Sequence, residues 1–180
     1  MKTKQIDLNF DITKIDKILI IQTAFLGDII LTIPLINNLK KLFPNKHIAV
    51  LTTPIGKTIL EEQDSIDEIL VFDKKGKDKG FFSMLKLIIK LRCMSFDWLI
   101  SPHRSFKTAL IGLLACIPHR WGFSNSEAGF FYDHLIEYKK EVPDLERNLF
   151  FLEPFIEDNN ISNLNKAIRF NFNNQIEKQT

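Results

Sequence analysis

The chain has 180 residues, of which 45% are hydrophobic and 26% are charged, which is enough apolar material for one ordinary domain with a buried core. This composition excludes an intrinsically disordered or collagen-like chain. The 24 Lys and Arg against 22 Asp and Glu leave a net charge of +2, which is too balanced for a general nucleic-acid-binding protein with a dominant basic field.

Cysteine usage and the N-terminus indicate the compartment. Cys93 and Cys116 lie in apolar stretches outside any CxxC or Cys/His cluster, so neither a disulfide framework nor a structural zinc site is expected. No apolar run reaches the roughly 18–20 residues that span a bilayer. Residues 1–16 are polar and mixed in charge, without the apolar core of a signal peptide. The sequence therefore predicts a cytoplasmic protein.

Short β-branched runs alternate along the chain with longer amphipathic runs. The first strand is predicted at 17–22, where four consecutive Ile and Leu residues are typical of a strand covered on both faces. The further predicted strands are 47–52, 68–72, 98–101, 120–123 and 134–138, and the predicted helices are 28–43, 54–63, 81–94, 105–116 and 147–156. This alternation predicts an α/β fold with a doubly wound, Rossmann-like parallel sheet.

The predicted domain organisation has three parts. Residues 1–16 form an N-terminal extension, residues 17–158 form the Rossmann-like domain, and residues 159–180 contain a final strand at 167–172 and the start of a linker. Within the helix 28–43, Pro34 cannot donate a backbone hydrogen bond, so we expect the helix to kink or restart there.

The loop after the first strand is where doubly wound proteins hold their ligands. Here it runs from Thr23 to Asp28 with one glycine and no Lys-Ser/Thr pair, so it is neither a GxGxxG fingerprint nor a P-loop. Asp28 would repel a phosphate at this helix start, because it adds negative charge where backbone amides meet an anion. Two roles remain open: Asp28 caps the helix, or it accepts a proton from a sugar hydroxyl.

A second polar loop, residues 101–107, follows the fourth strand. With the usual strand order 3-2-1-4-5, this loop and the Asp28 loop flank one crevice at the topological switch point. A carboxylate on one side and Arg104 and Lys107 on the other suit a polar, anionic substrate. Alternatively, Ser105 caps the next helix and the basic side chains are only solvated.

The segment 73–94 combines basic and apolar residues. Its loop carries Lys74, Lys75, Lys77 and Lys79, which either meet acceptor phosphates or carboxylates or form a flexible solvated loop. The helix 81–94 is apolar around most of its circumference, more than packing on one sheet requires. This excess indicates either contact with a second element or docking at a membrane surface. The residues offered for docking are Phe81, Phe82, Leu85, Ile88 and Ile89, beside Lys86, Lys90 and Arg92.

Several blocks of this sequence resemble the bacterial lipopolysaccharide heptosyltransferases, glycosyltransferase family 9. The blocks are KILII at 17–21, LGDIILTIPL at 26–35, KKLFP at 40–44, DEILVFD at 67–73, SFKTAL at 105–110, IPHRWGF at 117–123 and ERNL at 146–149. They occur in the family's order between residues 17 and 156. The two blocks within 105–123 are similar to the subfamily that adds the second inner-core heptose.

The resemblance implies a GT-B fold, in which an N-terminal Rossmann-like domain binds the acceptor and a C-terminal domain binds the nucleotide sugar. It implies that this chain is the acceptor-binding half and that the donor-binding domain is absent from it. The implied function is inverting transfer of a heptose from ADP-heptose to the inner core of lipopolysaccharide. The alternative is a catalytically incomplete module that binds an anionic glycolipid or a partner protein.

The resemblance also implies partners and site residues. The partners are a lipid A–Kdo or heptosylated core acceptor, ADP-heptose and the cytoplasmic surface of the inner membrane, where the protein is peripheral; no cofactor, metal or nucleic acid is implied. The family's proposed general base corresponds to Asp28. The candidate acceptor-binding residues are Gly27, Arg104, Ser105, Lys107, Lys74 and Lys75. Where the family often carries an Ala-Arg-Glu-like element, this chain has Ser126 in place of the arginine, so one acceptor-phosphate contact is expected to be missing.

Overall fold

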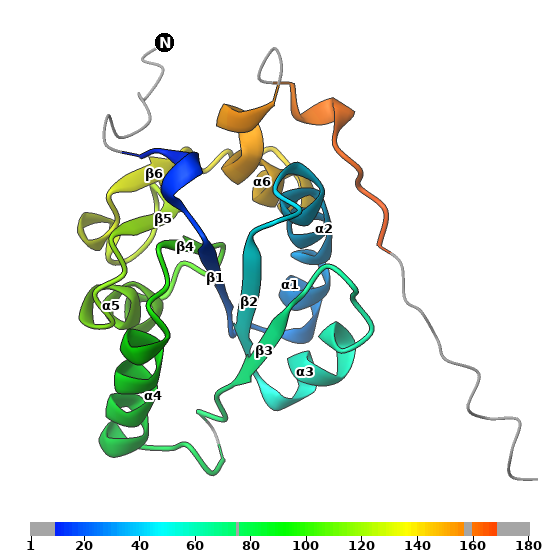
Figure 1. The fold of residues 1–180 in the computed structure, drawn as a ribbon. Helices are drawn as coiled ribbons and strands as arrows, with labels where there is room; N and C mark the ends of the chain where they lie inside the picture. The colour runs from blue at the N-terminus through cyan, green and yellow to red at the C-terminus, as the bar shows by residue number, and fades with distance from the viewer. Residues whose placement is uncertain (1–9, 75, 157–159, 169–180) are drawn as a thin grey trace, which may run out of the picture.

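The computed structural model describes residues 10–74, 76–156 and 160–168, which form a parallel six-stranded sheet between two layers of helices (Figure 1). The strands are β1 (Lys17–Gln22), β2 (His47–Thr52), β3 (Glu68–Val71), β4 (Trp98–Ser101), β5 (His119–Phe123) and β6 (His134–Ile136). Their order is β3-β2-β1-β4-β5-β6, and all neighbouring strands are parallel. The predicted α/β fold with a doubly wound sheet is confirmed.

The helices divide between the two faces of this sheet. They are α1 (Leu26–Ile30), α2 (Ile33–Leu42), α3 (Pro54–Leu60), α4 (Phe81–Met94), α5 (Phe106–Leu114) and α6 (Asp144–Leu149). Short 3-10 helices lie at η1 (Ile12–Lys14), η2 (Gly129–Phe131), η3 (Phe150–Phe155) and η5 (Ile161–Asn163). In Figure 1, α4 and α5 cover one face, and α1, α2, α3 and α6 cover the other.

Strand β1 shows why the sheet needs both layers. Ile18 and Ile20 pack into the core beneath α2 and η3, whereas Leu19 and Ile21 pack into the core beneath α4 and α5. Successive side chains of a strand point to opposite faces, so an unbroken apolar run is stable only when both faces are covered. All four side chains are essentially inaccessible to solvent.

The predicted helix 28–43 is two helices. It breaks at Leu31 and Thr32, whose backbone amides donate to the carbonyls of Gly27 and Ile29 and close α1. Pro34 lies in the first turn of α2, where a missing N–H costs no intrahelical hydrogen bond. The predicted restart is therefore confirmed, and the break falls just before the proline rather than at it.

The C-terminal segment differs more from the predictions. The helix predicted at 147–156 begins earlier, after Pro143, and continues beyond Leu149 as the 3-10 helix η3, which contains Pro154. Pro154 has no N–H to donate, so an unbroken α-helix through residue 156 is disfavoured. Of the final strand predicted at 167–172, Ala167 and Ile168 are not in a strand, and the remainder lies outside the described residues.

Residues 10–16 pack at the amino end of the sheet. The Phe10 ring lies 4.9 Å from the ring centroids of both Trp98 and Trp121 and 5.9 Å from that of Phe155. Ile15 is buried beside them. These aromatic and aliphatic contacts bring part of the segment predicted as an N-terminal extension into the core of the sheet.

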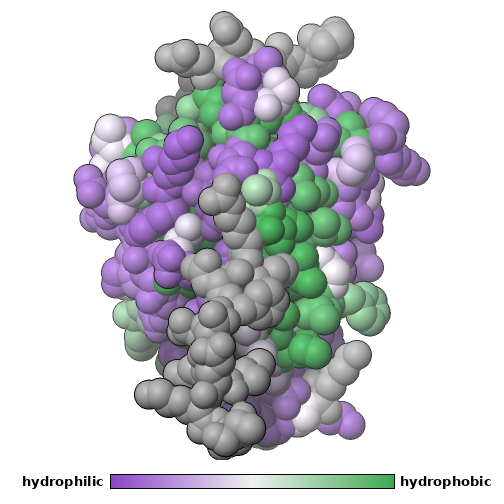
Figure 2. Space-filling model, turned by 90° about the vertical axis from the view of Figure 1, so that its right-hand side faces the viewer, coloured by the Kyte–Doolittle hydropathy of each residue, from purple (hydrophilic) through white to green (hydrophobic). Residues whose placement is uncertain are grey.

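The outer surface of the molecule is mixed in hydropathy. The side carrying α2 and α3 is largely hydrophilic, with an apolar strip along its middle (Figure 2). None of the helices in the described ranges has both the length and the hydropathy of a membrane span.

Candidate active site

A cavity of about 910 Å³ opens at the carboxyl ends of the strands. Its lining is drawn from strand ends and the residues after them: Gln22 ends β1, Thr53 follows β2 and Phe72 follows β3. Pro102 follows β4, and Phe123 ends β5. Because β2 and β4 lie on opposite sides of β1, the connections leave in opposite directions here, and the cavity occupies the topological switch point.

Asp28 lies in the first turn of α1 and lines this cavity. Its Oδ2 accepts a hydrogen bond from the backbone N–H of Phe25 at 3.2 Å, which is a capping contact. The side chain is half-buried, and no hydrogen bond to its Oδ1 is found within the described residues. The carboxylate of this cavity-lining residue thus caps the helix through Oδ2, while Oδ1 is not engaged in that contact.

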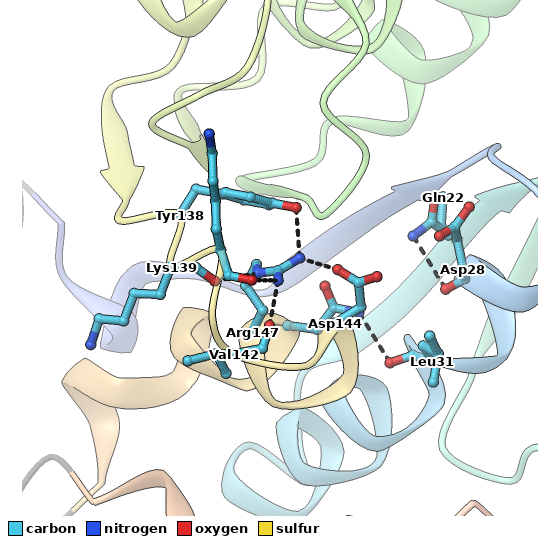
Figure 3. A network of polar contacts seen from close by, with 10 residues as sticks. Gln22, Asp28, Leu31, Tyr138, Lys139, Val142, Asp144 and Arg147 are labelled. Atoms are coloured by element: carbon cyan, nitrogen blue, oxygen red, sulfur yellow. Dashed lines mark hydrogen bonds and ion pairs between the residues drawn. The ribbon is translucent and has the colours of Figure 1, made fainter.

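A buried polar network holds the turn that carries Asp28 (Figure 3). The Gln22 amide nitrogen donates to Thr32 Oγ1 at 3.0 Å and to the Asp28 carbonyl at 3.4 Å, and the Thr32 hydroxyl donates to that same carbonyl at 2.7 Å. From α6, the Asn148 amide donates to the Leu31 carbonyl at 3.0 Å. These bonds occupy carbonyls at the end of α1 that the break from α2 would leave unpaired.

Gln22 was not among the predicted site residues. It is 3% exposed and lines the cavity, and its Oε1 has no hydrogen-bond partner within the described residues. The available sequence signal was its position as the polar last residue of an otherwise apolar strand, at the edge where ligands bind.

The predicted basic residues do not all reach the cavity. Arg104 lines it, and its guanidinium stacks 4.6 Å from the centroid of the Tyr138 ring. Lys74 also lines it, and its Nζ donates to the Thr23 carbonyl at 2.8 Å. Ser105 and Lys107 follow Arg104 into α5 and are not part of the lining.

Two predicted acceptor-binding residues remain, Gly27 and Lys75. Gly27 is exposed and is not part of the lining, although it precedes Asp28 directly. Lys75 lies outside the described residues. The cationic side chains that the structure brings to the cavity from the predicted set are therefore Lys74 and Arg104.

His103 is a second lining residue that the sequence reasoning did not select, although the loop 101–107 was singled out. Its Nδ1 lies 3.4 Å from the buried Thr108 hydroxyl. Burial lowers the pKa of His103 below its usual value near 6.5, and the nearby charge of Lys74 lowers it further against the opposing effect of Asp28. The imidazole is therefore neutral at neutral pH and can exchange hydrogen bonds with sugar hydroxyls.

Arg147 forms the wall of the cavity opposite α1 (Figure 3). Its guanidinium donates to the Tyr138 hydroxyl at 2.7 Å and lies 4.1 Å from the Tyr138 ring centroid. It also donates to the carbonyls of Lys139 and Val142 and pairs with Asp144. With its donors engaged in this way, the buried Arg147 holds the loop between β6 and α6 in place.

The turn that departs from the family pattern supports the Arg104 loop. The Ser126 hydroxyl donates to the Arg104 carbonyl at 3.1 Å, and the backbone N–H of Glu127 donates to the same carbonyl at 3.3 Å. A Glu127 oxygen accepts from the backbone N–H of Phe106 at 3.2 Å. Ser126 thus positions the backbone of the loop after β4 by contacts that are all within the chain.

The cavity can therefore bind a polar ligand of mixed character. Asp28 supplies a carboxylate, His103 a neutral imidazole, and Lys74 and Arg104 supply positive charge for an anionic group. Across residues 10–74, 76–156 and 160–168, no group of three or more His, Cys, Asp or Glu side chains is arranged to hold a metal ion.

Comparison with known proteins identifies relatives in sequence. No protein-family model matches the chain. Over 143 residues it is 32% identical to lipopolysaccharide heptosyltransferase 3 of Escherichia coli strain K12, and the match covers 71% of this chain and 39% of the relative. The chain thus spans about two fifths of the length of the curated relative it matches.

Solved structures share the fold. A glycosyltransferase of family 9 from Veillonella parvula superposes with a TM-score of 0.73 at 24% identity, covering 83% of this chain and 44% of that one. The E. coli heptosyltransferase WaaC with ADP-2-deoxy-2-fluoro heptose gives a TM-score of 0.69 at 15% identity, with 84% and 52% covered. E. coli ADP-heptose lipopolysaccharide heptosyltransferase II gives 0.65 at 24% identity, with 86% and 45% covered. Sequence and fold together confirm the predicted family: this chain is a relative of the lipopolysaccharide heptosyltransferases of glycosyltransferase family 9.

Proposed function

We propose that this chain is the acceptor-binding part of a glycosyltransferase that transfers a heptose from ADP-heptose to the inner core of lipopolysaccharide. The observation that carries the proposal is the position of Asp28, which lines a cavity at the switch point together with Arg104 and Lys74. The relatives support the same class of reaction, because the sequence relative and two of the structural relatives are named as heptosyltransferases.

The proposed reaction uses Asp28 Oδ1, the carboxylate oxygen that does not accept from Phe25, as a general base. An acceptor hydroxyl gives its proton to Asp28 Oδ1 while the hydroxyl oxygen bonds to the anomeric carbon of the heptose. The bond from that carbon to the diphosphate breaks on the opposite side, so ADP leaves and the configuration inverts. A positioned general base contributes about 10²–10⁴-fold to such a step.

Positive charge at the cavity serves recognition of the acceptor. Lys74 and Arg104 face an acceptor that carries carboxylate or phosphate groups, and a guanidinium can bind either group through two parallel hydrogen bonds. The neutral His103 adds a group that can donate to or accept from a sugar hydroxyl. The donor sugar nucleotide is assigned to a second domain of the GT-B type.

The test separates acceptor binding from transfer. A lipid A–Kdo acceptor is first titrated against the 180-residue chain, and saturable binding that Arg104→Gln weakens is expected. Transfer from ADP-heptose is then measured with a family 9 donor domain added, and product is expected only in its presence. Acceptor binding without transfer under these conditions would favour a binding module, and absence of binding would contradict the assignment.

A further inference from the structure

The apolar helix α4 does not bury all of its apolar surface. Leu87, Ile88 and Leu91 are buried against the sheet, as expected for a helix in this layer. Phe82 and Ile89 are exposed by 77% and 54% of their surface. At 3.6 residues per turn, these two lie on the side of the helix opposite the buried stripe.

The outward side of α4 is thus apolar where an ordinary helix is polar. Phe81 is 67% exposed and Leu85 is 41% exposed, so four large apolar side chains face solvent within nine residues of one helix. Ile88, which was predicted to be offered for docking with them, is buried and belongs to the core. Single exposed apolar residues are normal, but a cluster on one helix face is typical of an interaction site.

Basic residues border this surface. Lys86, Lys90 and Arg92 are exposed on α4, and Lys77 and Lys79 are exposed in the loop that precedes it. Residues 79–95 contain no Asp or Glu. A stripe of aromatic and aliphatic side chains with lysines at its border matches the chemistry of an anionic lipid surface: apolar groups enter the acyl boundary, and ammonium groups meet the phosphates.

The position of this surface relative to the cavity supports the same partner. The loop 72–80 contributes Phe72, Asp73 and Lys74 to the cavity and then leads directly into the first turn of α4. In Figure 1, the start of α4 lies at the end of the molecule where the strands terminate. A ligand anchored in a bilayer that contacts Phe81 and Phe82 would therefore be presented at the cavity side.

We infer that the outward face of α4, formed by Phe81, Phe82, Leu85 and Ile89 with the basic residues at its border, docks the protein on an anionic bilayer surface. The inference rests on the exposure and charge of α4 and holds whether or not the cavity transfers a sugar. Dimerisation through the same face is the competing outcome.

Vesicle cosedimentation of the 180-residue chain tests this directly. Vesicles of phosphatidylcholine alone are compared with vesicles of equal parts phosphatidylcholine and phosphatidylglycerol, at low and high salt. Binding is expected with the anionic vesicles only and is expected to weaken as salt rises. Equal binding to both vesicle types, salt-insensitive binding or no binding would each overturn the inference.

Paired variants locate the contact on α4. Lys86→Gln with Lys90→Gln is expected to lower the partition coefficient about tenfold or more, and Phe81→Ser with Phe82→Ser to lower it at least as much. The control Lys41→Gln with Lys57→Gln removes the same charge from α2 and α3 and should leave partitioning within about twofold, because these helices cover the other face of the sheet. Leu114→Ser at the far end of α5 is the apolar control.

Sedimentation equilibrium without lipid tests whether the outward face of α4 binds a second copy of this chain instead. The chain is expected to remain monomeric, and its circular dichroism spectrum and that of each variant should agree. A concentration-dependent dimer that Phe81→Ser with Phe82→Ser abolishes would replace the bilayer with a protein partner and contradict the inference.

Discussion

At the scale of single residues, Asp28 shows that a capping role and a chemical role are compatible in one carboxylate. Its Oδ2 accepts the Phe25 N–H, and the same side chain lines the cavity. The two interpretations that the sequence left open for Asp28 are therefore not exclusive. A neutral amide at position 28 would preserve the capping contact but would remove the proton acceptor.

Asp28→Asn separates the two roles. The amide oxygen can still accept from Phe25, but it cannot take a proton from a hydroxyl at neutral pH. With a donor domain supplied, we expect the transfer rate to fall by about 10²-fold or more, with acceptor affinity largely unchanged. Urea unfolding serves as the control for folding. Full turnover in a folded variant would leave Asp28 as a helix cap only.

His103 gives a pH dependence with a defined sign. Its folded-state pKa is lowered chiefly by burial and then by Lys74, so the unfolded chain binds this proton first as the pH falls. The contribution of His103 to stability is present above its unfolded pKa near 6.5 and is lost as the pH decreases below that value. We expect wild-type protein to lose more stability than His103→Gln between about pH 7.5 and about pH 5 in urea unfolding. Parallel losses in the two proteins would contradict this prediction.

At the scale of elements, close approach between a helix and a strand fixes α5 on the sheet. A Cβ added at Gly112 of α5 would lie 2.3 Å from Cδ2 of Leu99, which is fully buried in β4. Glycine in a helix interior costs about 1 kcal/mol relative to alanine in propensity. The sequence therefore accepts a poor helix former here because the backbone of α5 lies against β4.

Gly112→Ala is expected to destabilise the protein by about 1–3 kcal/mol despite the gain in helix propensity, because the added methyl forces the fully buried Leu99 side chain to shift within the core. Gly27→Ala is the matched control, since a Cβ at Gly27 of α1 has no atom within 4 Å. That substitution should be neutral or slightly stabilising. Both free energies of unfolding come from urea titration, and equal effects at the two positions would show that propensity, not packing, dominates.

At the scale of the whole molecule, the chain places its chemistry at one edge of the sheet. Asp28, Lys74 and Arg104 follow three different strands, β1, β3 and β4, and line one cavity although 76 positions separate Asp28 from Arg104. What this edge lacks is a phosphate cradle: the loop after β1 has one glycine and places Asp28 in the first turn of α1.

The 180-residue chain alone is therefore expected to bind neither ADP nor ADP-heptose. Isothermal titration calorimetry with each nucleotide should give no saturable heat, whereas the acceptor should still bind. Low-micromolar binding of ADP would contradict the prediction and would place a nucleotide site within this chain.

The sequence alone determined the layered architecture. Buried parallel strands are predicted from unbroken apolar runs such as 18–21. Helices are predicted from the spacing of their apolar residues, and α4 was predicted at its observed bounds, 81–94. The position of two polar loops after apolar strands indicated Asp28 and Arg104, and the blocks shared with the heptosyltransferases gave the family and the general-base role of Asp28. These are local signals, carried by residues adjacent in the chain.

Only the tertiary structure decided which of the predicted site residues line the same cavity. Lys107 and Ser105 follow Arg104 directly in the sequence, yet α5 carries them away from the lining, while His103 and Gln22 enter it. The structure also showed that Arg147 is engaged by Tyr138 and Asp144, and that Ile88 faces the sheet while Ile89 faces solvent. Each outcome depends on where a distant strand or helix packs, and no local pattern of residues encodes that position.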